Sequence, residues 1–318
     1  MTALCHWETC RRTPNAGAFG RHNFLLPAAH CRHLARVKLS AAEIRAAVRA
    51  ALAEDLGSGD ATTLATVPRT ATARAVMRAR VPLTVAGLAF AQEAFRQMGR
   101  IRLMSPISDG SRARAGETML EVSGSARAIL SAERVALNFV QRLSGVATLT
   151  AQFVTAVRGT RAEILDTRKT TPGWRRFEKF AVACGGGRNH RIGLFDMILI
   201  KDNHLTALRD ATPNAVAAAV ARARKKFPQL KVEVEADTLA QVAQAADAGA
   251  DIILLDNMSR AQLRAAVKLV HGRAQLEASG GVNLKTVRGL AQTDVDFISV
   301  GALTHSAPAV DIGLDFEE

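Results

Sequence analysis

Apolar and polar positions follow regular spacings from residue 39 onward, and these spacings predict both helices and strands. Ser40 and Glu43 have the spacing of a capping box, so the pattern predicts a helix that starts there and ends at Gly57. Between residues 72 and 122, short apolar runs are separated by turn residues, with one helical stretch at residues 89–99. This part of the chain therefore predicts a small, mostly antiparallel sheet accompanied by a helix.

Two amphipathic helices are expected next, at residues 126–142 and 145–157, with Ser144 as the cap between them. From Ile164 onward, about six apolar strands each end in a polar residue or glycine and alternate with helical patterns. Strands that alternate with helices form a parallel sheet, and continuous apolar strands favour a TIM-like β/α barrel. An open, doubly wound sheet is the alternative fold for this half of the chain.

The composition is that of a globular protein, and it limits the expected partners. None of the apolar runs in the 318 residues approaches the ~18 residues of a membrane span, so no membrane partner is expected. The formal net charge of +13 favours anionic partners such as nucleic acid, phosphates or carboxylates. However, most arginines lie among alanines in helical patterns, which are typical of solvated faces, and Tyr is absent. Stacking on nucleic-acid bases is therefore poorly supported, and nucleic acid is not expected as a partner.

The cysteines indicate a reduced, cytoplasmic protein, because no two of Cys5, Cys10, Cys31 and Cys184 have CxxC spacing. Three of them lie within residues 1–37, which show no helical or strand period and no secretory signal. The cysteines and histidines of this stretch match no zinc pattern. We expect residues 1–37 to be a disordered extension, or the result of a start codon assigned too far upstream. A transit peptide is the weaker alternative.

Charged residues and glycines stand at the end of strand after strand in the second half. In a β/α barrel the active site lies at the carboxyl ends of the strands. Because a buried, unpaired charge costs several kcal/mol, its repeated placement there favours a functional rim over a structural one. The residues at the predicted strand ends are Asp166, Arg168, Lys169, Lys201, Glu235, Asp256, Ser279, Gly280, Gly281 and Gly301.

This rim combines three kinds of group, which together fit a phosphorylated sugar and a carboxylate-bearing co-substrate. Glu235 and Asp256 suit Mg²⁺, sugar hydroxyls or a cationic intermediate. The turns at residues 279–281 and 299–302 leave backbone N–H groups open where phosphate binds in this fold. Arginine suits bidentate recognition of carboxylate or phosphate. The positive groups are Arg168, Lys169, His190, Arg191 and Lys201.

Long segments of the chain carry the most specific information. In the second half they are DTRKTTPGW (166–174), EKFAVACGGGRNHR (178–191), MILIKDNH (197–204), VEVE (232–235), LLDNM (254–258), EASGG (277–281) and ISVGAL (298–303). Upstream they are EDLGSGDATT (54–63) and SAERVALNFVQRLSGVAT (131–148). In their order along the chain, these segments resemble the core signature of quinolinate phosphoribosyltransferases. The resemblance runs from about residue 39 to the end of the chain.

The resemblance implies an α/β sandwich over residues 38–142 and an open, TIM-like β/α barrel of about seven strands over residues 143–318, including a C-terminal tail. It implies that phosphoribosyl pyrophosphate and quinolinate react to give nicotinate mononucleotide, pyrophosphate and CO₂ in NAD biosynthesis. The implied cofactor is Mg²⁺. The implied assembly is a homodimer or a higher even-numbered oligomer with shared active sites.

The resemblance also implies the site residues. Catalytic roles fall on Lys169, Lys201, Glu235 and Asp256, and the two acids are expected to hold Mg²⁺, partly through pyrophosphate. Arg134 is expected to reach the active site of the neighbouring subunit. The implied ligand-binding residues are Arg134, Thr167, Arg168, Lys169, His190, Arg191, Lys201, Glu235, Asp256, Ser279, Gly280, Gly281, Ser299, Val300 and Gly301.

Other functions fit the sequence less well. A paralogue of the same fold, linked to molybdate transport loci, need not keep every arginine that binds two carboxylates. A nicotinate phosphoribosyltransferase, with one substrate carboxylate, would not call for so much positive charge. A basic nucleic-acid-binding protein would need its charge on one patch. A nucleophilic pair of Cys184 and His190 is the weaker chemical alternative, since such a cysteine is more often packed in a core.

Overall fold

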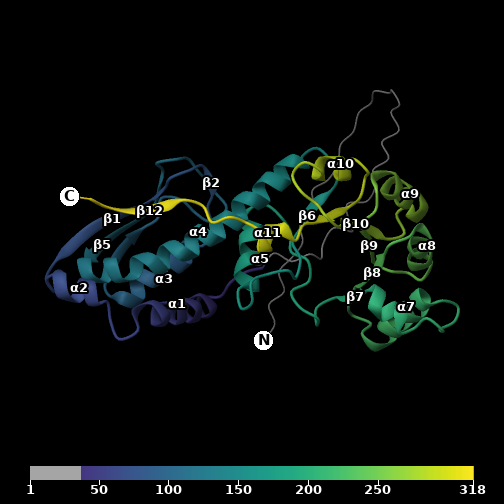
Figure 1. Cartoon of the computed structure of the whole chain (residues 1–318), viewed down its shortest axis with the longest axis horizontal. Helices are drawn as coiled ribbons and strands as arrows, with labels where there is room; N and C mark the ends of the chain where they lie inside the picture. The colour runs from purple at the N-terminus through teal and green to yellow at the C-terminus, as the bar shows by residue number, and fades with distance from the viewer. Residues whose placement is uncertain (1–36, 318) are drawn as a thin grey trace, which may run out of the picture. The chain divides into compact units, whose positions relative to one another are not determined.

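The computed structural model describes residues 37–317 (Figure 1). The predicted N-terminal extension therefore lies outside the described residues, except for Val37. This residue is buried, and its backbone N–H donates to the side-chain oxygen of Asn189 at 2.9 Å. Val37 thus belongs to the folded part rather than to the extension. Within residues 37–317, no helix is long and apolar enough to cross a membrane.

The first half of the described chain forms an antiparallel sheet accompanied by helices. Its elements are α1 (Ala41–Leu56), α2 (Ala61–Thr66), β1 (Thr72–Ala79), β2 (Leu83–Thr84), α3 (Leu88–Met98), β3 (Ile101–Met104), β4 (Arg112–Ala113), β5 (Thr118–Ser125) and α4 (Ala126–Ala156). The predicted capping box starts α1, where Ser40 and Glu43 each accept the other's backbone N–H. β5 pairs antiparallel with both β1 and β3, which confirms the predicted sheet.

Helix α4 is one helix of 31 residues where the sequence predicted two. The buried hydroxyl of Ser144 accepts the backbone N–H of Ala86 at 3.0 Å and donates to its carbonyl oxygen at 3.1 Å. At Gly145, an added Cβ would lie 2.0 Å from the carbonyl oxygen of Pro308. The prediction of two helices was wrong because this Ser–Gly pair serves close packing rather than capping. The expected domain boundary, between residues 142 and 143, falls within the helix.

The second half is a parallel sheet whose strands alternate with helices. Its elements are β6 (Glu163–Leu165), α5 (Arg175–Cys184), β7 (Ile198–Ile200), α6 (Asp202–Thr206), α7 (Ala215–Lys226), β8 (Val232–Ala236), α8 (Leu239–Asp247), β9 (Ile252–Asp256), α9 (Arg260–Val270), β10 (Gln275–Ser279), α10 (Val287–Ala291), β11 (Phe297–Ser299) and α11 (Ala302–His305). The strand order is β6-β11-β10-β9-β8-β7. Figure 1 shows α7, α8 and α9 following one another along the outside of these strands. The predicted open, TIM-like barrel is thus confirmed.

The described sheet has six strands, although about seven were expected. A single parallel bridge between Leu165 and Arg188 marks the place of the seventh. There the backbone N–H of Arg188 donates to Ile164 at 2.8 Å, and that of Asp166 donates to Arg188 at 3.2 Å. Residues 189–197 then lead to β7 without a helix. The expected strand is reduced to one bridge because the chain leaves the sheet directly after it.

The last strand, β12 (Ile312–Glu317), returns to the first sheet and pairs antiparallel with β1. From the sequence, this tail was expected to belong to the barrel domain. The structure places it at the edge of the first sheet, where it covers the backbone groups that β1 would otherwise expose. Arg78 on β1 also pairs with Glu317 at 2.9 Å. Since the two strands are far apart in the chain, no local pattern indicates that they pair.

Candidate active site

The carboxyl ends of the barrel strands meet at one edge because the strands are parallel and in register. Asp256 pairs with Ser279, and Leu165 pairs with Ser299. Glu235 lies opposite Leu254, two residues before Asp256. The structure thus brings most of the predicted site residues to this edge. They are Thr167, Arg168, Lys169, Lys201, Glu235, Asp256, Ser279, Gly280, Gly281, Ser299, Val300 and Gly301.

Other residues that the sequence analysis considered lie away from the strand ends. Arg134 is exposed on α4, in the first half of the chain. His204 is the exception, since it lies beside the end of β7, where its Nδ1 accepts the backbone N–H of Lys201 at 2.9 Å. Cys184 is partly buried and packs against the core, as expected for a packed cysteine.

Two glycines allow close approaches at this edge. Gly280 has a φ of +98°, and a Cβ there would lie 2.1 Å from the side-chain oxygen of Asn257. At Gly301, a Cβ would lie 3.1 Å from Cδ of Lys169 and 3.2 Å from Nε2 of His305. The lysine side chain therefore lies over the turn after β11. The sequence predicts a phosphate site at this turn.

Arg168 and Arg191 form a pair of neighbouring positive groups. Arg191 is buried, and its guanidinium donates to the carbonyl oxygen of Met197 at 3.2 Å. Burial lowers its pKa, and the neighbouring charge of Arg168 lowers it further. Nε of Arg168 is buried and has no hydrogen-bond partner among the described residues. A bound anion would relieve both the mutual repulsion and the unmet donor.

On the other side of the edge, basic and acidic groups of neighbouring strands meet. Nζ of Lys201, which follows β7, makes an ion pair with Glu235 on β8. Asp256 on β9 accepts a hydrogen bond from the side-chain amide of Asn257 at 2.8 Å. Two carboxylates on adjacent strands therefore face the same edge as the lysine and the glycine turns.

Beneath this edge, His190, Glu233 and Glu277 meet inside the barrel. Nε2 of His190 lies 3.0 Å from the carboxylate of Glu233 and 3.6 Å from that of Glu277. Both glutamates are fully buried, and neither carboxylate accepts a well-aligned hydrogen bond from the described residues. Burial, together with the charge of Glu233, raises the pKa of Glu277 to about 8. A proton is therefore held in this cluster at neutral pH.

The contacts of His190 indicate where its own proton lies. Nδ1 accepts the backbone N–H of Arg191 at 2.8 Å, so the ring proton lies on Nε2, toward the carboxylates. Burial by itself lowers the pKa of His190, but Glu277 and Glu233 outweigh it and raise the value to about 9. A second ring proton would have to displace the Arg191 N–H. The hydrogen-bond geometry thus opposes the raised pKa, and it favours a singly protonated ring with the extra proton on the carboxyl pair.

The same three groups are close enough to hold one metal ion, since their ligand atoms lie within 4.8 Å of one another. A metal-bound histidine ordinarily donates its other ring N–H to an acceptor. Here Nδ1 of His190 accepts a hydrogen bond instead. The geometry of the ring therefore favours a proton, rather than a metal ion, between the histidine and the glutamates.

Asp166 and Lys179 form a second buried group, and both side chains are fully buried. Lys179 contacts Asp166 and also donates to the carbonyl oxygen of His190 at 2.9 Å. Asp166 accepts the backbone N–H of His190 at 2.8 Å and the side-chain amide of Asn189 at 2.7 Å. Burial raises the pKa of Asp166 and lowers that of Lys179, while their pairing opposes both shifts. The pair fixes the backbone from which His190 and Arg191 extend.

Family models match the chain on both sides of the middle of α4. The model described as "Quinolinate phosphoribosyl transferase, N-terminal domain" matches residues 60–144. The model described as "Quinolinate phosphoribosyl transferase, C-terminal domain" matches residues 146–315. The chain belongs to the quinolinate phosphoribosyltransferase family.

Relatives in this family resemble the chain over most of its length. The carboxylating nicotinate-nucleotide pyrophosphorylase of Mycobacterium leprae (strain TN) is 44% identical over 279 residues, which cover 85% of this chain and 96% of the relative. The chloroplastic protein of that name from Arabidopsis thaliana is 42% identical over 292 residues, covering 86% and 83%. The solved nicotinate-nucleotide pyrophosphorylase of Francisella tularensis has a TM-score of 0.83 at 39% identity and covers 89% of this chain and 99% of its own.

Of the buried groups of this phosphoribosyltransferase fold, Glu233, Glu277 and Lys179 were given no role from the sequence. Asp166 was expected on the functional rim, but it is fully buried and paired with Lys179. A signal existed for two of them, because Glu233 lies two residues before Glu235 and Glu277 lies two residues before Ser279. Residues two apart on a strand point to the same side, so both glutamates belong inside the barrel, below the edge. Lys179 gave no such signal, because it lies on a helix and its partner lies on another element.

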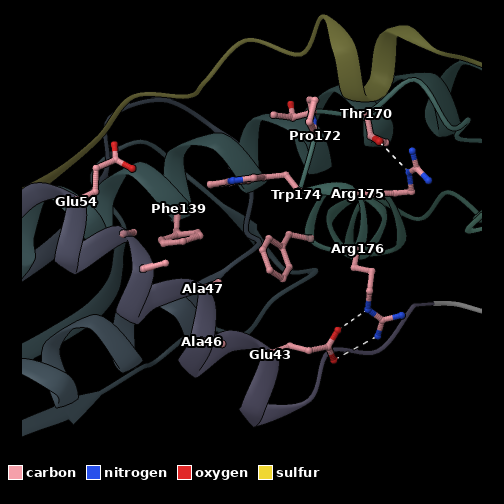
Figure 2. Close-up of a pocket in the computed structure, with 15 residues that line it drawn as sticks. Glu43, Ala46, Ala47, Glu54, Phe139, Thr170, Pro172, Trp174, Arg175 and Arg176 are labelled. Atoms are coloured by element: carbon pink, nitrogen blue, oxygen red, sulfur yellow. Dashed lines mark hydrogen bonds and ion pairs between the residues drawn. The ribbon is translucent and has the colours of Figure 1, made fainter.

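A cavity of about 860 Å³ lies between α1 and the loop that continues from Lys169, and no predicted site residue lines it (Figure 2). Alanines of α1 form one wall, and residues 170–174 with the start of α5 form the other. Trp174 stacks on Phe139 with ring centroids 5.0 Å apart. Arg176 on α5 pairs with Glu43 on α1. These contacts tie the loop after β6 to the first half of the chain.

Proposed function

We propose that this protein transfers the phosphoribosyl group of phosphoribosyl pyrophosphate to quinolinate, with loss of CO₂ and pyrophosphate, to give nicotinate mononucleotide for NAD synthesis. The observation that carries the proposal is the pair of neighbouring guanidinium groups of Arg168 and Arg191 at the carboxyl edge of the barrel. Two such groups side by side suit a substrate with two carboxylates. Membership of the family and the names of the relatives support the same reaction.

The acidic residues fit the first chemical step. The pyridine nitrogen attacks the anomeric carbon as pyrophosphate leaves, and positive charge develops on the sugar. Glu235 and Asp256, on adjacent strands, are the carboxylates that we assign to stabilise this charge. Lys169, over the turn after β11, and Lys201 are assigned to neutralise the departing pyrophosphate.

Mg²⁺ is the proposed cofactor, and Glu235 and Asp256 would hold it. Carboxylate oxygens are the ligand type that Mg²⁺ prefers. Because Lys201 already contacts Glu235, the two acids do not form a closed protein cage, which fits an ion that is bound partly through pyrophosphate. Such an ion would neutralise charge on the leaving group.

The positive residues fit the second step. Ribosylation makes the ring nitrogen cationic, and that cation stabilises the carbanion that remains when the adjacent carboxylate departs as CO₂. The carbanion then takes up a proton from solvent to give the product. The protein must therefore hold both carboxylates and align the nitrogen. We assign the first task to Arg168 and Arg191, with Arg134 of a neighbouring subunit. His190, whose ring nitrogens face Glu233 and the backbone N–H of Arg191, would act by holding Arg191 in place.

The test is to mix the protein with quinolinate, phosphoribosyl pyrophosphate and Mg²⁺ and to follow nicotinate mononucleotide by chromatography. Nicotinate is the matched control substrate, because it lacks one carboxylate and should react far more slowly. Absence of the product would contradict the proposed function. Equal turnover of nicotinate and quinolinate would contradict the assignment of the arginines to a dicarboxylate.

We also propose a homodimer, or a higher even-numbered oligomer, in which Arg134 completes the neighbouring active site. Arg134→Ala should lower kcat/KM by about 10- to 150-fold, or roughly 1.5–3 kcal/mol, because a charge-assisted contact is lost. Mixing Arg134→Ala subunits with Lys201→Ala subunits creates some sites with both changes and some with neither. Activity should then exceed that of either parent. No recovery, despite confirmed subunit exchange, would show that Arg134 does not act across an interface.

We also propose a cytoplasmic location. It rests on the cysteine spacing, which suits a reducing compartment. Fractionation of cells that produce the full chain at its natural level tests this point.

A further inference from the structure

An ion pair between Arg142 and Glu178 joins α4 to α5 of the barrel. Nη2 of Arg142 donates to Oε1 of Glu178 at 2.7 Å. The side chain of Glu178 is fully buried, and that of Arg142 is 26% exposed. A carboxylate buried to this degree needs donors for its oxygens. Its other contacts therefore show what the pair holds in place.

Glu178 holds the loop that follows β6. The backbone N–H of Thr171 donates to Oε2 of Glu178 at 3.0 Å, and the Thr171 hydroxyl donates to Oε1 at 2.9 Å. Together with Arg142, these contacts occupy both carboxylate oxygens. Thr171 is exposed, so water could satisfy its N–H, yet the N–H is bonded to a buried charge. The pair therefore fixes where the loop lies.

Arg142 and Thr304 hold the same loop at a second point. Arg142 donates to the carbonyl oxygens of Thr304 at 2.5 Å and of Ala307 at 2.6 Å. The hydroxyl of the fully buried Thr304 donates to the carbonyl oxygen of Lys169 at 2.6 Å. The loop is thus anchored at residue 169 through Thr304 and at residue 171 through Glu178. Arg142 is bonded to both anchors.

The anchored loop carries two of the positive groups at the carboxyl edge. Arg168 immediately precedes the first anchor, and the side chain of Lys169 lies over Gly301. Beyond the anchors, Figure 2 shows the loop running along the cavity, where Arg175 donates to the hydroxyl of Thr170 at 3.1 Å. A displacement of about 1 Å at a reacting site can lower the rate about 100-fold. The two anchors therefore determine where Arg168 and Lys169 lie at the site.

We propose that Arg142, Glu178 and Thr304 are positioning residues that hold Arg168 and Lys169 in place beside the turn after β11. None of the three has to touch a substrate, since they act through the backbone of the loop. The inference rests on the proposed function in one respect, namely that Arg168 and Lys169 bind the anionic substrates.

The test compares two substitutions of Thr304. Thr304→Val keeps the shape and removes the hydroxyl donor, whereas Thr304→Ser keeps the donor. Thr150→Val is the matched control, because the fully buried hydroxyl of Thr150 donates at 2.8 Å to Val146 within α4. We expect Thr304→Val to lower kcat/KM for quinolinate about tenfold, mainly through KM, as expected for one lost hydrogen bond. Thr304→Ser and Thr150→Val should stay close to the unsubstituted protein.

The thermal midpoints of the three variants separate positioning from stability. The inference is supported if KM rises in Thr304→Val but not in Thr304→Ser or Thr150→Val. The thermal midpoint of Thr304→Val should then be similar to that of Thr150→Val. Equal KM values for Thr304→Val and Thr304→Ser would overturn it. If the unsubstituted protein makes no nicotinate mononucleotide, the proposed function fails instead. Calorimetry with pyrophosphate then decides the inference, because weaker binding by Thr304→Val than by Thr304→Ser supports it and equal binding overturns it.

Discussion

The barrel holds two layers of charged groups that differ in exposure and in partners. At the carboxyl edge, the side chain of Lys201 is 45% exposed although it pairs with Glu235, and Arg168 keeps an unmet donor. In the deeper layer, which is defined by burial, Asp166 and Lys179 are fully buried and are bonded to each other and to the backbone. A deeply buried charge must be paired, whereas an exposed one can be solvated until a ligand binds. The deeper layer therefore holds the fold, and the upper layer is available for ligands.

The deeper layer is itself divided. Asp166 accepts hydrogen bonds from Lys179, Asn189 and the backbone of His190. Glu233 and Glu277 are as deeply buried but have no well-aligned donors among the described residues. Two neighbouring buried carboxylates cannot both ionise at low cost, so one of them keeps a proton. The deeper layer thus contains one pair, Asp166 and Lys179, whose charged groups are fully hydrogen-bonded, and a second pair, Glu233 and Glu277, that holds a proton.

The largest expected effect is on stability, and it follows from breaking the pair of Asp166 and Lys179. Lys179→Met should lower the free energy of unfolding by about 3–5 kcal/mol, because it leaves Asp166 buried without its counter-ion. Urea unfolding measures this change. Lys201→Met is the matched control in the upper layer and should change stability by less than about 1 kcal/mol. Similar losses for the two lysines would mean that depth does not separate the layers.

The next effect concerns the upper layer. Arg168→Met should lower kcat/KM by about 10- to 150-fold, or roughly 1.5–3 kcal/mol, because a charge-assisted contact to substrate is lost. Stability should not fall, since Arg168 repels Arg191 in the folded protein. Steady-state kinetics and urea unfolding test the two parts. Arg222→Met, on the exposed face of α7, is the control. A loss of stability equal to the loss of activity would assign Arg168 to the fold instead.

The two layers also differ in how far the sequence predicts them. Strand-end residues such as Lys201 and Asp256 follow apolar runs directly, so the pattern alone places them at the carboxyl edge of a barrel. The role of Lys179 depends on how α5 lies beside Asp166, the residue that follows β6, and no spacing in the chain encodes that placement. The single helix α4 was missed for a similar reason. Its Ser144 and Gly145 contact Ala86 and Pro308, which are distant in the chain.

The last expected effect, the smallest when it is taken per pH unit, is a change in the pH dependence of stability, and it tests the pair that holds a proton. The pKa of Glu277 rises from 4.5 to about 8 because of burial and the neighbouring charge of Glu233. The folded protein therefore keeps a proton that the unfolded chain has released. A raised pKa in the folded state means that the stabilisation is complete below pH 4.5 and is lost as the pH rises through about 8.

Between these limits, each proton held only by the folded state changes the free energy of unfolding by about 1.4 kcal/mol per pH unit. Glu277→Gln keeps the shape and stays uncharged at every pH, so it should flatten the decline between about pH 5 and pH 8. Urea unfolding at several pH values gives the slope. Glu54→Gln, an exposed carboxyl on α1, should keep the slope of the unsubstituted protein. An unchanged slope in Glu277→Gln would mean that Glu233 and Glu277 are both ionised. The deeper layer would then contain no pair that holds a proton.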